Sequence, residues 1–365
     1  MKFVSASYVF TKEFNDPAAW VFNIRFYTGI LEALSINNSV ISVEQIDFNG
    51  EYFKNGVDYR FKRLSKLGRY LPVKLHRFIK KQNPDVVFIQ GLHFPLQVIL
   101  LRFHLGRKVK IMVQNHAEKP FTGIKKHLQR WASYYVDAYL FASYAMGVDW
   151  VDKGNLVSAQ KIHEVMEVSS VFYPVKKSQA IAATGVIGKP AFLWVGRLDQ
   201  NKDPLNVISA FLKFTNSYPF AVLYMIYGTD ELLPKILEIL ESHPRIKSIV
   251  LIGKIPNDEL LYWYNSVDFI LSGSHYEGSG TAVCEAMSCG CVPVVTDISS
   301  FRMITDNGKC GLLYEPGSEN ALLAALIQSQ EIDLQQKRDM CLEYYKSNLS
   351  FEAIAQRIEK IAVSL

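Results

Sequence analysis

The sequence predicts an α/β protein built from two doubly wound domains, each a parallel sheet covered by helices. Three observations lead to this prediction. The chain has 365 residues, more than one hydrophobic core usually organises. Short apolar, β-rich runs alternate with amphipathic helical runs, the pattern of parallel strands joined by crossover helices. This alternation stops near residue 174 and restarts near residue 191.

Residues 1–173 are expected to form the first domain. Its strands are predicted at 2–10, 39–46, 84–90, 108–114 and 137–142, and its helices at about 17–35, 70–82, 95–105 and 122–135. The first helix has a clear start, because Asp16 is a good N-cap residue and Pro17 suits the first helical position.

Residues 174–190 are expected to be a linker, since they hold Pro174, two lysines and a run of small residues that ends in Gly188-Lys189-Pro190. The second domain is predicted at 191–348, with strands at 191–196, 221–227, 247–252, 268–271 and 292–295. Helices are predicted between them and at 319–328 and 334–346. Residues 349–365 have helical periodicity and are expected to cross back to the first domain.

Composition excludes several classes of protein. With 49% hydrophobic and 21% charged residues, the chain is neither collagen-like nor disordered. No apolar run is long enough for a spanning helix, and the first ten residues are too polar for a signal peptide. The five cysteines form no CxxC pair and are expected to be reduced core residues. We therefore expect a cytoplasmic protein.

Charge is distributed unevenly along the chain. Residues 1–172 carry 23 Lys and Arg against 14 Asp and Glu, a net +9, whereas the remainder carries 17 against 21, a net −4. The basic stretch 61–81 also contains interleaved apolar residues. This pattern favours an anionic partner, either a membrane surface (the inner face of the cytoplasmic membrane) or a lipid diphosphate. An anionic glycan and a merely solvated basic face are the alternatives, and no nucleic-acid-binding motif accompanies the charge.

A small-residue turn at 272–280 follows a predicted strand and opens a predicted helix. Such a turn lets backbone amides approach an anion, and the helix dipole assists. Glu277 and Glu285 flank the turn and are suited to binding hydroxyl groups, as in ribose recognition. A helix cap and a solvated glutamate are the alternative explanation.

Arg197 and Lys202 lie just after the first strand of the second domain, where a diphosphate needs cations. They are otherwise ordinary surface residues. Because the sequence has no DxD pair and no cluster of carboxylates with histidine, no metal is expected and protein cations would neutralise the phosphates.

These motifs together resemble the retaining glycosyltransferases of family 4 (glycosyl transferases group 1), which have the GT-B fold. The resemblance rests on Glu277-x7-Glu285 with Gly278-Ser279-Gly280, on Cys289-Gly290-x-x-Pro293-Val294-Val295, on Val195-Gly196-Arg197-Leu198 with Lys202, and on Gly228-Thr229-Asp230, and it covers most of residues 190–330. It implies two Rossmann-like domains facing a central cleft, of which residues 1–173 bind the acceptor and residues 191–348 bind the nucleotide-sugar donor. One departure is that Asp16-Pro17-Ala18-Ala19 stands where the family has a Gly-Gly loop near the donor phosphates.

The resemblance also implies the site residues. Glu277 would orient the sugar, Arg197 and Lys202 would hold the diphosphate, and His116 would lie near the donor sugar. Other donor contacts would come from Glu285 at the ribose, from the backbone near Lys254 at the base, and from Gly278, Ser279, Gly280, Thr281 and Gly228.

The expected function is transfer of a sugar, with retained anomeric configuration, from a nucleotide-diphosphate sugar to a glycan or lipid-linked acceptor in cell-surface polysaccharide synthesis. The expected enzyme is a metal-independent hexosyltransferase with no cofactor. A non-catalytic nucleotide-sugar-binding protein and a nucleotide-sugar epimerase of the same architecture are the alternatives.

Overall fold

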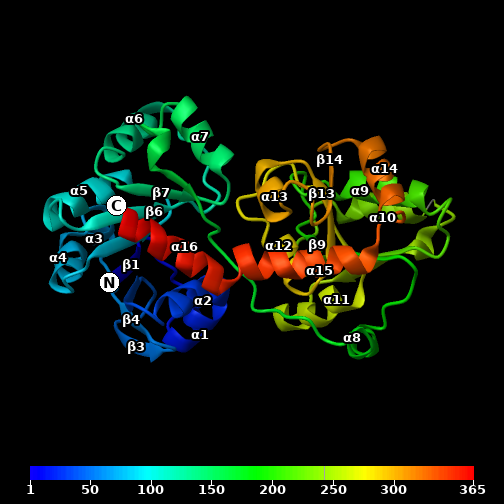
Figure 1. The fold of residues 1–365 in the computed structure, drawn as a ribbon, viewed down its shortest axis with the longest axis horizontal. Coiled ribbons are helices and arrows are strands. Elements are labelled where there is room, and N and C mark those ends of the chain that lie inside the picture. Colours follow the sequence, from blue (N-terminus) through cyan, green and yellow to red (C-terminus); the bar gives the residue numbers. More distant parts are fainter. Residues whose placement is uncertain (242) are drawn as a thin grey trace. The chain divides into compact units, whose positions relative to one another are not determined.

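The computed structural model describes residues 1–241 and 243–365, which form two compact units. Unit 1 contains Met1–Ser169 and Phe351–Leu365, and unit 2 contains Ser170–Ser350 (Figure 1). Each unit is a sheet covered by helices.

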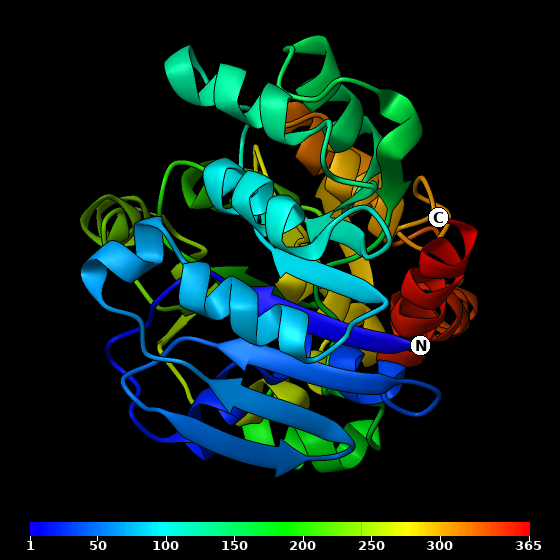
Figure 2. The ribbon, with the colours of Figure 1, turned by 90° about the vertical axis from the view of Figure 1, so that its left-hand side faces the viewer.

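The sheet of unit 1 has eight strands in the order β3-β4-β2-β1-β5-β6-β7-β8. All neighbours are parallel except β3 and β4. Figure 2 shows several of these strands side by side in blue to cyan. Their bounds are β1 Lys2–Ser7, β2 Ser39–Glu44, β3 Gly50–Lys54, β4 Val57–Phe61, β5 Val86–Gln90, β6 Lys110–Gln114, β7 Ala138–Phe141 and β8 Ile162–Glu164.

The helices of unit 1 close to the predicted positions include α5 Pro95–Leu105 and α6 Gly123–Ala132. The helix expected over 17–35 is divided into α1 Pro17–Asn23 and α2 Arg25–Leu34, and the one expected over 70–82 into α3 Lys66–Tyr70 and α4 Val73–Lys81. Helix α7 Tyr144–Asp152 and the 3-10 turn Ala159–Lys161 complete this part.

A β-hairpin missing from the sequence prediction forms the edge of this sheet. Strands β3 and β4 join through Asn55 and Gly56, which have φ of 47° and 82°. A Cβ at Gly56 would lie 2.4 Å from Ser35 Oγ, so both the turn and the packing require glycine there.

The C-terminal helix α16 (Phe351–Ser364) packs against α2 in unit 1 (Figure 1). Asn38 Nδ2 donates a hydrogen bond of 2.9 Å to Glu359 Oε1. The ring of Phe351 lies against Gly29, where a Cβ would come within 2.6 Å of it. This helix therefore returns to the first unit, as expected from the sequence.

The sheet of unit 2 has six parallel strands in the order β11-β10-β9-β12-β13-β14. The strand order reverses between β9 and β12, which is where a doubly wound sheet opens a crevice at its carboxyl edge. The bounds are β9 Ala191–Gly196, β10 Val222–Tyr227, β11 Ile249–Gly253, β12 Phe269–Ser272, β13 Val292–Thr296 and β14 Leu312–Tyr314.

The helices of unit 2 form two groups by their mutual contacts, α8, α11, α12 and α15 in one and α9, α10 and α14 in the other. Their bounds are α8 Lys177–Thr184, α9 Pro204–Phe214, α10 Leu233–Glu241, α11 Leu260–Ser266, α12 Thr281–Ser288, α13 Ser299–Ile304, α14 Glu319–Gln328 and α15 Leu334–Tyr344. Short turns of 3-10 helix at Ile246–Ser248 and Asn257–Glu259 and of π-helix at Tyr345–Leu349 join them.

The stretch expected to be a linker, 174–190, is instead part of unit 2. Helix α8 lies within it and packs against α11. Ala180 is fully buried, and Thr184 Oγ1 lies 2.8 Å from Ser266 Oγ. Small residues that read as a linker in the sequence are therefore packing residues.

The sequence analysis also made predictions about the cysteines and about membrane-spanning helices. All five cysteines are free and buried, as predicted. None of the helices within residues 1–241 and 243–365 is both long and apolar enough to cross a membrane.

Candidate functional site

The carboxyl edge of the unit 2 sheet carries every donor-site residue predicted in that unit. Arg197 and Lys202 follow β9, Gly228 follows β10, and Lys254 follows β11. The segment 277–281 follows β12, the neighbour of β9 across the point where the strand order reverses. Because parallel strands end at the same edge, the fold gathers these residues at the position where such sheets bind ligands.

Lys202 and Glu277 meet directly. Lys202 Nζ donates to Glu277 Oε1, and the two side chains are only 21% and 14% exposed. The same two loops are also joined by Asn201, whose Nδ2 donates to the Tyr276 carbonyl at 2.9 Å and whose own carbonyl accepts from the His275 amide at 2.9 Å. Residues 75 positions apart are thus held as one structure.

Arg197 has a partner that the sequence analysis missed. Its Nε lies 2.9 Å from Asp199 Oδ2, and Asp199 Oδ1 accepts the amide of Lys202 at 3.0 Å. The Arg197 side chain is 62% exposed. Asp199 lies between Arg197 and Lys202 in the sequence. A carboxylate at that position could have been predicted to pair with one of the two cations. Both predicted diphosphate cations therefore have a carboxylate partner in the protein.

The turn that opens α12 is held in a conformation that only glycine adopts readily. Gly280 is the N-cap residue with φ of 57°, and a Cβ there would lie 2.6 Å from the Phe301 ring. No side chain caps this helix. Within the described part of the chain, the amides of Thr281 and Ala282 donate no hydrogen bond, so both remain available to an anion.

Glu285, one turn further along α12, is oriented by a buried tyrosine. The Tyr264 hydroxyl donates a 2.9 Å hydrogen bond to Glu285 Oε2. Burial, and then the charge of Glu285, raise the pKa of Tyr264 well above its ordinary value, so the phenol keeps its proton. The sequence analysis predicted no role for Tyr264.

Gly228 and Lys254 lie further out on the same edge and are both exposed. A Cβ at Gly228 would meet nothing within 4 Å. The structure leaves space there for a ligand but shows no packing reason for the glycine.

His116 lies in unit 1, just after β6, between two polar side chains. Its Nδ1 is 2.8 Å from Glu167 Oε2 and its Nε2 is 2.8 Å from Gln90 Oε1. Burial disfavours the imidazolium, but the charge and hydrogen bond of Glu167 and the charge of Glu118 outweigh burial and raise the pKa of His116. Glu167 and Gln90 are functional candidates that the sequence analysis missed.

At the start of α1, where the resemblance would place a Gly-Gly loop, the backbone amides bind a carboxylate of the protein itself. Asp16 accepts the amides of Ala18 and Ala19 at 3.1 and 3.2 Å. These two amides are therefore occupied by a carboxylate of the protein itself.

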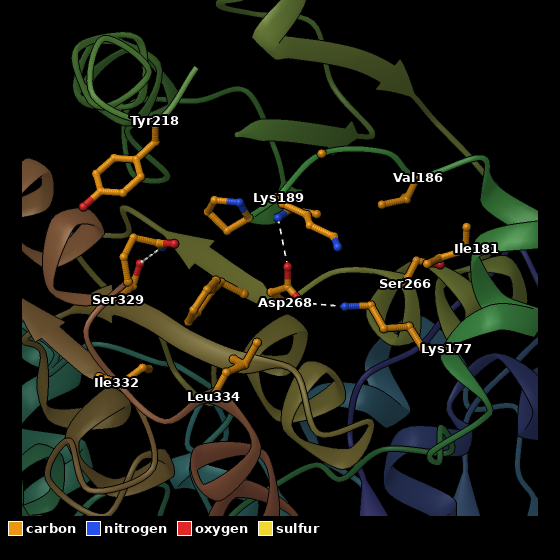
Figure 3. Close-up of a pocket in the computed structure, with 15 residues that line it drawn as sticks. Lys177, Ile181, Val186, Lys189, Tyr218, Ser266, Asp268, Ser329, Ile332 and Leu334 are labelled. Carbon is orange, nitrogen blue, oxygen red and sulfur yellow. Dashed lines mark hydrogen bonds and ion pairs between the residues drawn. The ribbon is translucent and has the colours of Figure 1, made fainter. Parts of the chain in front are cut away.

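A separate depression of about 470 Å³ lies at the opposite, amino-terminal ends of β9 and β12 (Figure 3). Asp268 dominates it, accepting the Ala191 amide at 3.0 Å and pairing with Lys177 Nζ at 2.5 Å. None of the predicted site residues lines it, and its charged groups serve to anchor α8 and β9.

Residues 1–241 and 243–365 contain no group of three or more His, Cys, Asp or Glu side chains that could hold a metal ion.

The comparisons with known proteins centre on unit 2. Residues 179–347 match the model of the family described as glycosyl transferases group 1. O-antigen chain mannosyltransferase B of Escherichia coli is 26% identical over 145 residues, which are 39% of this chain and 37% of that protein. The N-acetylgalactosamine-N,N'-diacetylbacillosaminyl-diphospho-undecaprenol 4-alpha-N-acetylgalactosaminyltransferase of Campylobacter jejuni is 29% identical over 142 residues, again 39% and 37% of the two chains. Each match thus spans less than two fifths of the relative.

Solved structures are similar over the whole chain. A glycosyltransferase from Rickettsia africae has a TM-score of 0.74 at 15% identity, covering 100% of this chain and 98% of that one. Anabaena HepE, solved in complex with UDP, has a TM-score of 0.73 at 14% identity with both chains fully covered. These similarities confirm the predicted GT-B fold of two parallel-sheet α/β domains.

Proposed function

We propose that this chain, whose second unit is the domain of the group 1 glycosyltransferases, transfers a sugar from a nucleotide-diphosphate sugar to a glycan or lipid-linked acceptor. The observation that carries this proposal is the carboxyl edge of the unit 2 sheet. Two cations, two unbonded amides and three carboxylates lie there, on the segments that follow the two strands of the switch point. This set suits a molecule with a diphosphate at its centre and hydroxyl groups at both ends.

Each group has a proposed task in the transfer. Arg197 and Lys202 stabilise the charge that develops on the leaving nucleoside diphosphate, together with the amides of Thr281 and Ala282. Glu285, oriented by Tyr264, accepts hydrogen bonds from the ribose hydroxyls. Glu277 orients the transferred sugar once the diphosphate draws Lys202 away from it.

The finer features of the reaction are proposals on the same basis. We propose retention of the anomeric configuration, membership of family 4, independence from metal, and a role in cell-surface polysaccharide synthesis. His116 is proposed to bind the donor sugar, and the charge of Glu167, 2.8 Å from its ring, raises the pKa of His116 against the effect of burial.

A membrane-facing surface is proposed for residues 61–81 of unit 1. Leu67, Tyr70 and Leu71 are 72%, 64% and 50% exposed, beside the cations Lys74 and Arg77. All of these except Tyr70 border, along with Arg63, a groove of about 590 Å³. Exposed apolar side chains next to cations fit an anionic lipid surface or a lipid diphosphate. Flotation with anionic liposomes tests this, and no binding at low salt would end the idea.

The enzymatic proposal is tested by incubating the protein with UDP-, GDP- and ADP-sugars and a panel of glycan and lipid-linked acceptors, with products identified by mass spectrometry. Transfer from one donor, with the anomer retained by NMR, is the expected result. A new nucleotide sugar formed without acceptor would favour the epimerase. Binding of the donor with neither transfer nor hydrolysis would favour the non-catalytic protein.

A further inference from the structure

Unit 1 contains a cavity of about 270 Å³, and His116 is the one residue of its wall to which the proposed function gives a role. It lies at the carboxyl ends of β1, β2, β5 and β6, where the strand order of this sheet reverses. Trp20, Phe26, Tyr27 and Phe94 contribute aromatic surface to its wall. Aromatic faces with a few polar groups between them are well suited to a sugar ring, which has apolar C–H faces and a polar rim.

Glu44 is the most unusual polar group of this cavity. It ends β2 and is only 3% exposed. Its Oε1 accepts the Ser42 hydroxyl at 2.8 Å and its Oε2 accepts Trp20 Nε1–H at 3.3 Å. No described Lys, Arg or His pairs with it, and burial raises its pKa to about 6. A carboxylate has about four acceptor positions, so roughly two remain for a ligand.

The other charged groups of the cavity are already engaged. Glu118 accepts the amides of Leu92 and His116 at 2.9 and 2.6 Å and Asn115 Nδ2 at 2.9 Å. His116 is committed to Glu167. The residues that line the cavity include no Lys or Arg. The excess of Lys and Arg in unit 1 therefore does not extend to the wall of this cavity. Among its described lining residues, Glu44 is the carboxylate without a cationic partner.

We propose that this cavity binds the acceptor sugar and that Glu44 makes it select a sugar without an acidic group. The choice of the acceptor as occupant rests on the proposed function. A hydroxyl of a neutral sugar donates to Glu44 and satisfies a carboxylate that is otherwise short of donors. An acidic sugar would place a second carboxylate beside it, in a wall without Lys or Arg whose two histidines, His93 and His116, already face Glu118 and Glu167. This is strongly unfavourable. Glu44 acts here as a specificity-determining residue.

The test uses methyl glycosides of glucose, galactose, mannose and N-acetylglucosamine, with methyl glucuronide and methyl galacturonide as acidic counterparts. Binding to the full chain is measured at pH 8 by saturation-transfer NMR with titration. We expect at least one neutral glycoside to bind at least tenfold more tightly than its uronate. Glu44→Gln should reduce this ratio to less than threefold, because it removes the charge and keeps the shape. Glu13→Gln, an identical change at an exposed position outside the cavity, should leave the ratio unchanged.

Three results would overturn the proposal. They are equal binding of neutral and acidic sugars, no binding of any neutral glycoside at its highest soluble concentration, and a Glu44→Gln variant that weakens both kinds alike. The last result would mean that Glu44 only maintains the cavity. Nucleotide binding to unit 2 is measured on the same samples. Bound nucleotide without sugar selection refutes the cavity inference alone, whereas sugar selection without nucleotide binding refutes the proposed donor.

Discussion

Replacing Lys202 by Met removes the cation that faces Glu277 in the donor site. The pair is largely buried, with side chains 21% and 14% exposed, so the variant leaves a carboxylate without its partner. An unsatisfied charged group of this kind costs about 2 kcal/mol of unfolding free energy. For a unit of this size, that loss lowers the melting temperature by roughly 4–8 °C. Turnover should fall by about 10²–10³-fold, because a charge that stabilises the leaving diphosphate is gone.

The double variant Lys202→Met/Glu277→Gln separates these two effects. Removing the unpaired carboxylate should restore at least half of the lost stability without restoring turnover. Lys213→Met is a matched control in the same unit, because Lys213 pairs with Glu319 at the surface, where the two side chains are 55% and 30% exposed. It should cost less than about 1 kcal/mol and leave turnover unchanged.

The assays are thermal unfolding by circular dichroism and release of nucleoside diphosphate. If Lys202→Met retained wild-type turnover, or if the double variant recovered it, Lys202 would have no role at the diphosphate.

Three further predictions test single contacts. Glu44→Gln should change the pH dependence of stability. The folded-state pKa of about 6 lies above the unfolded value of 4.5, so the native state binds this proton more tightly. The wild type should therefore lose about 1 kcal/mol of unfolding free energy as pH rises from 4.5 to 6, and the variant should not, when urea unfolding is compared at both pH values. Gly280→Ala should destabilise by about 1–3 kcal/mol, because it adds a Cβ at φ of 57° and 2.6 Å from the Phe301 ring, and an unchanged urea midpoint would contradict this packing. Tyr264→Phe should weaken nucleotide affinity about tenfold by calorimetry, since Glu285 loses the 2.9 Å hydrogen bond that orients it, and an unaltered Kd would show that Tyr264 has no part in binding.

The elements predicted best from the sequence are those in which a run of buried apolar residues has clear start and stop signals. Strand β9 and helices α5 and α14 match their predicted ranges because buried runs and clear end signals coincide there. The hairpin of β3 and β4 was missed although Asn55-Gly56 is a strong turn signal, since β3 is an edge strand with no fully buried residue. Helix α8 was missed because its small residues are typical of linkers as well as of close packing.

The site was predictable to a similar degree and for a related reason. The positions that follow the strands of unit 2 could be read from the sequence, because the ends of parallel strands fix where a ligand binds. Where a predicted site residue pairs with a side chain that follows another strand, that partner could not be read from the sequence. The pairing of Lys202 with Glu277 joins segments 75 residues apart, and that of His116 with Glu167 joins two different strand ends, so both depend on packing. The hydrogen bonds by which Asp16 occupies the first amides of α1 are, in contrast, a local N-cap interaction within one helix.

The measurement that tests the central claim most directly is nucleotide binding at the carboxyl edge of unit 2. UDP, GDP and ADP, alone and as sugar conjugates, are tested by thermal shift with the wild-type protein and with Glu285→Ala. A ligand at 100 times its Kd stabilises the folded state by about 2.7 kcal/mol, which is a measurable shift. The account predicts that one base stabilises the wild type clearly and that Glu285→Ala loses most of this shift while its own unfolding without ligand is little changed. No shift with any nucleotide, or an equal shift in both proteins, would contradict it.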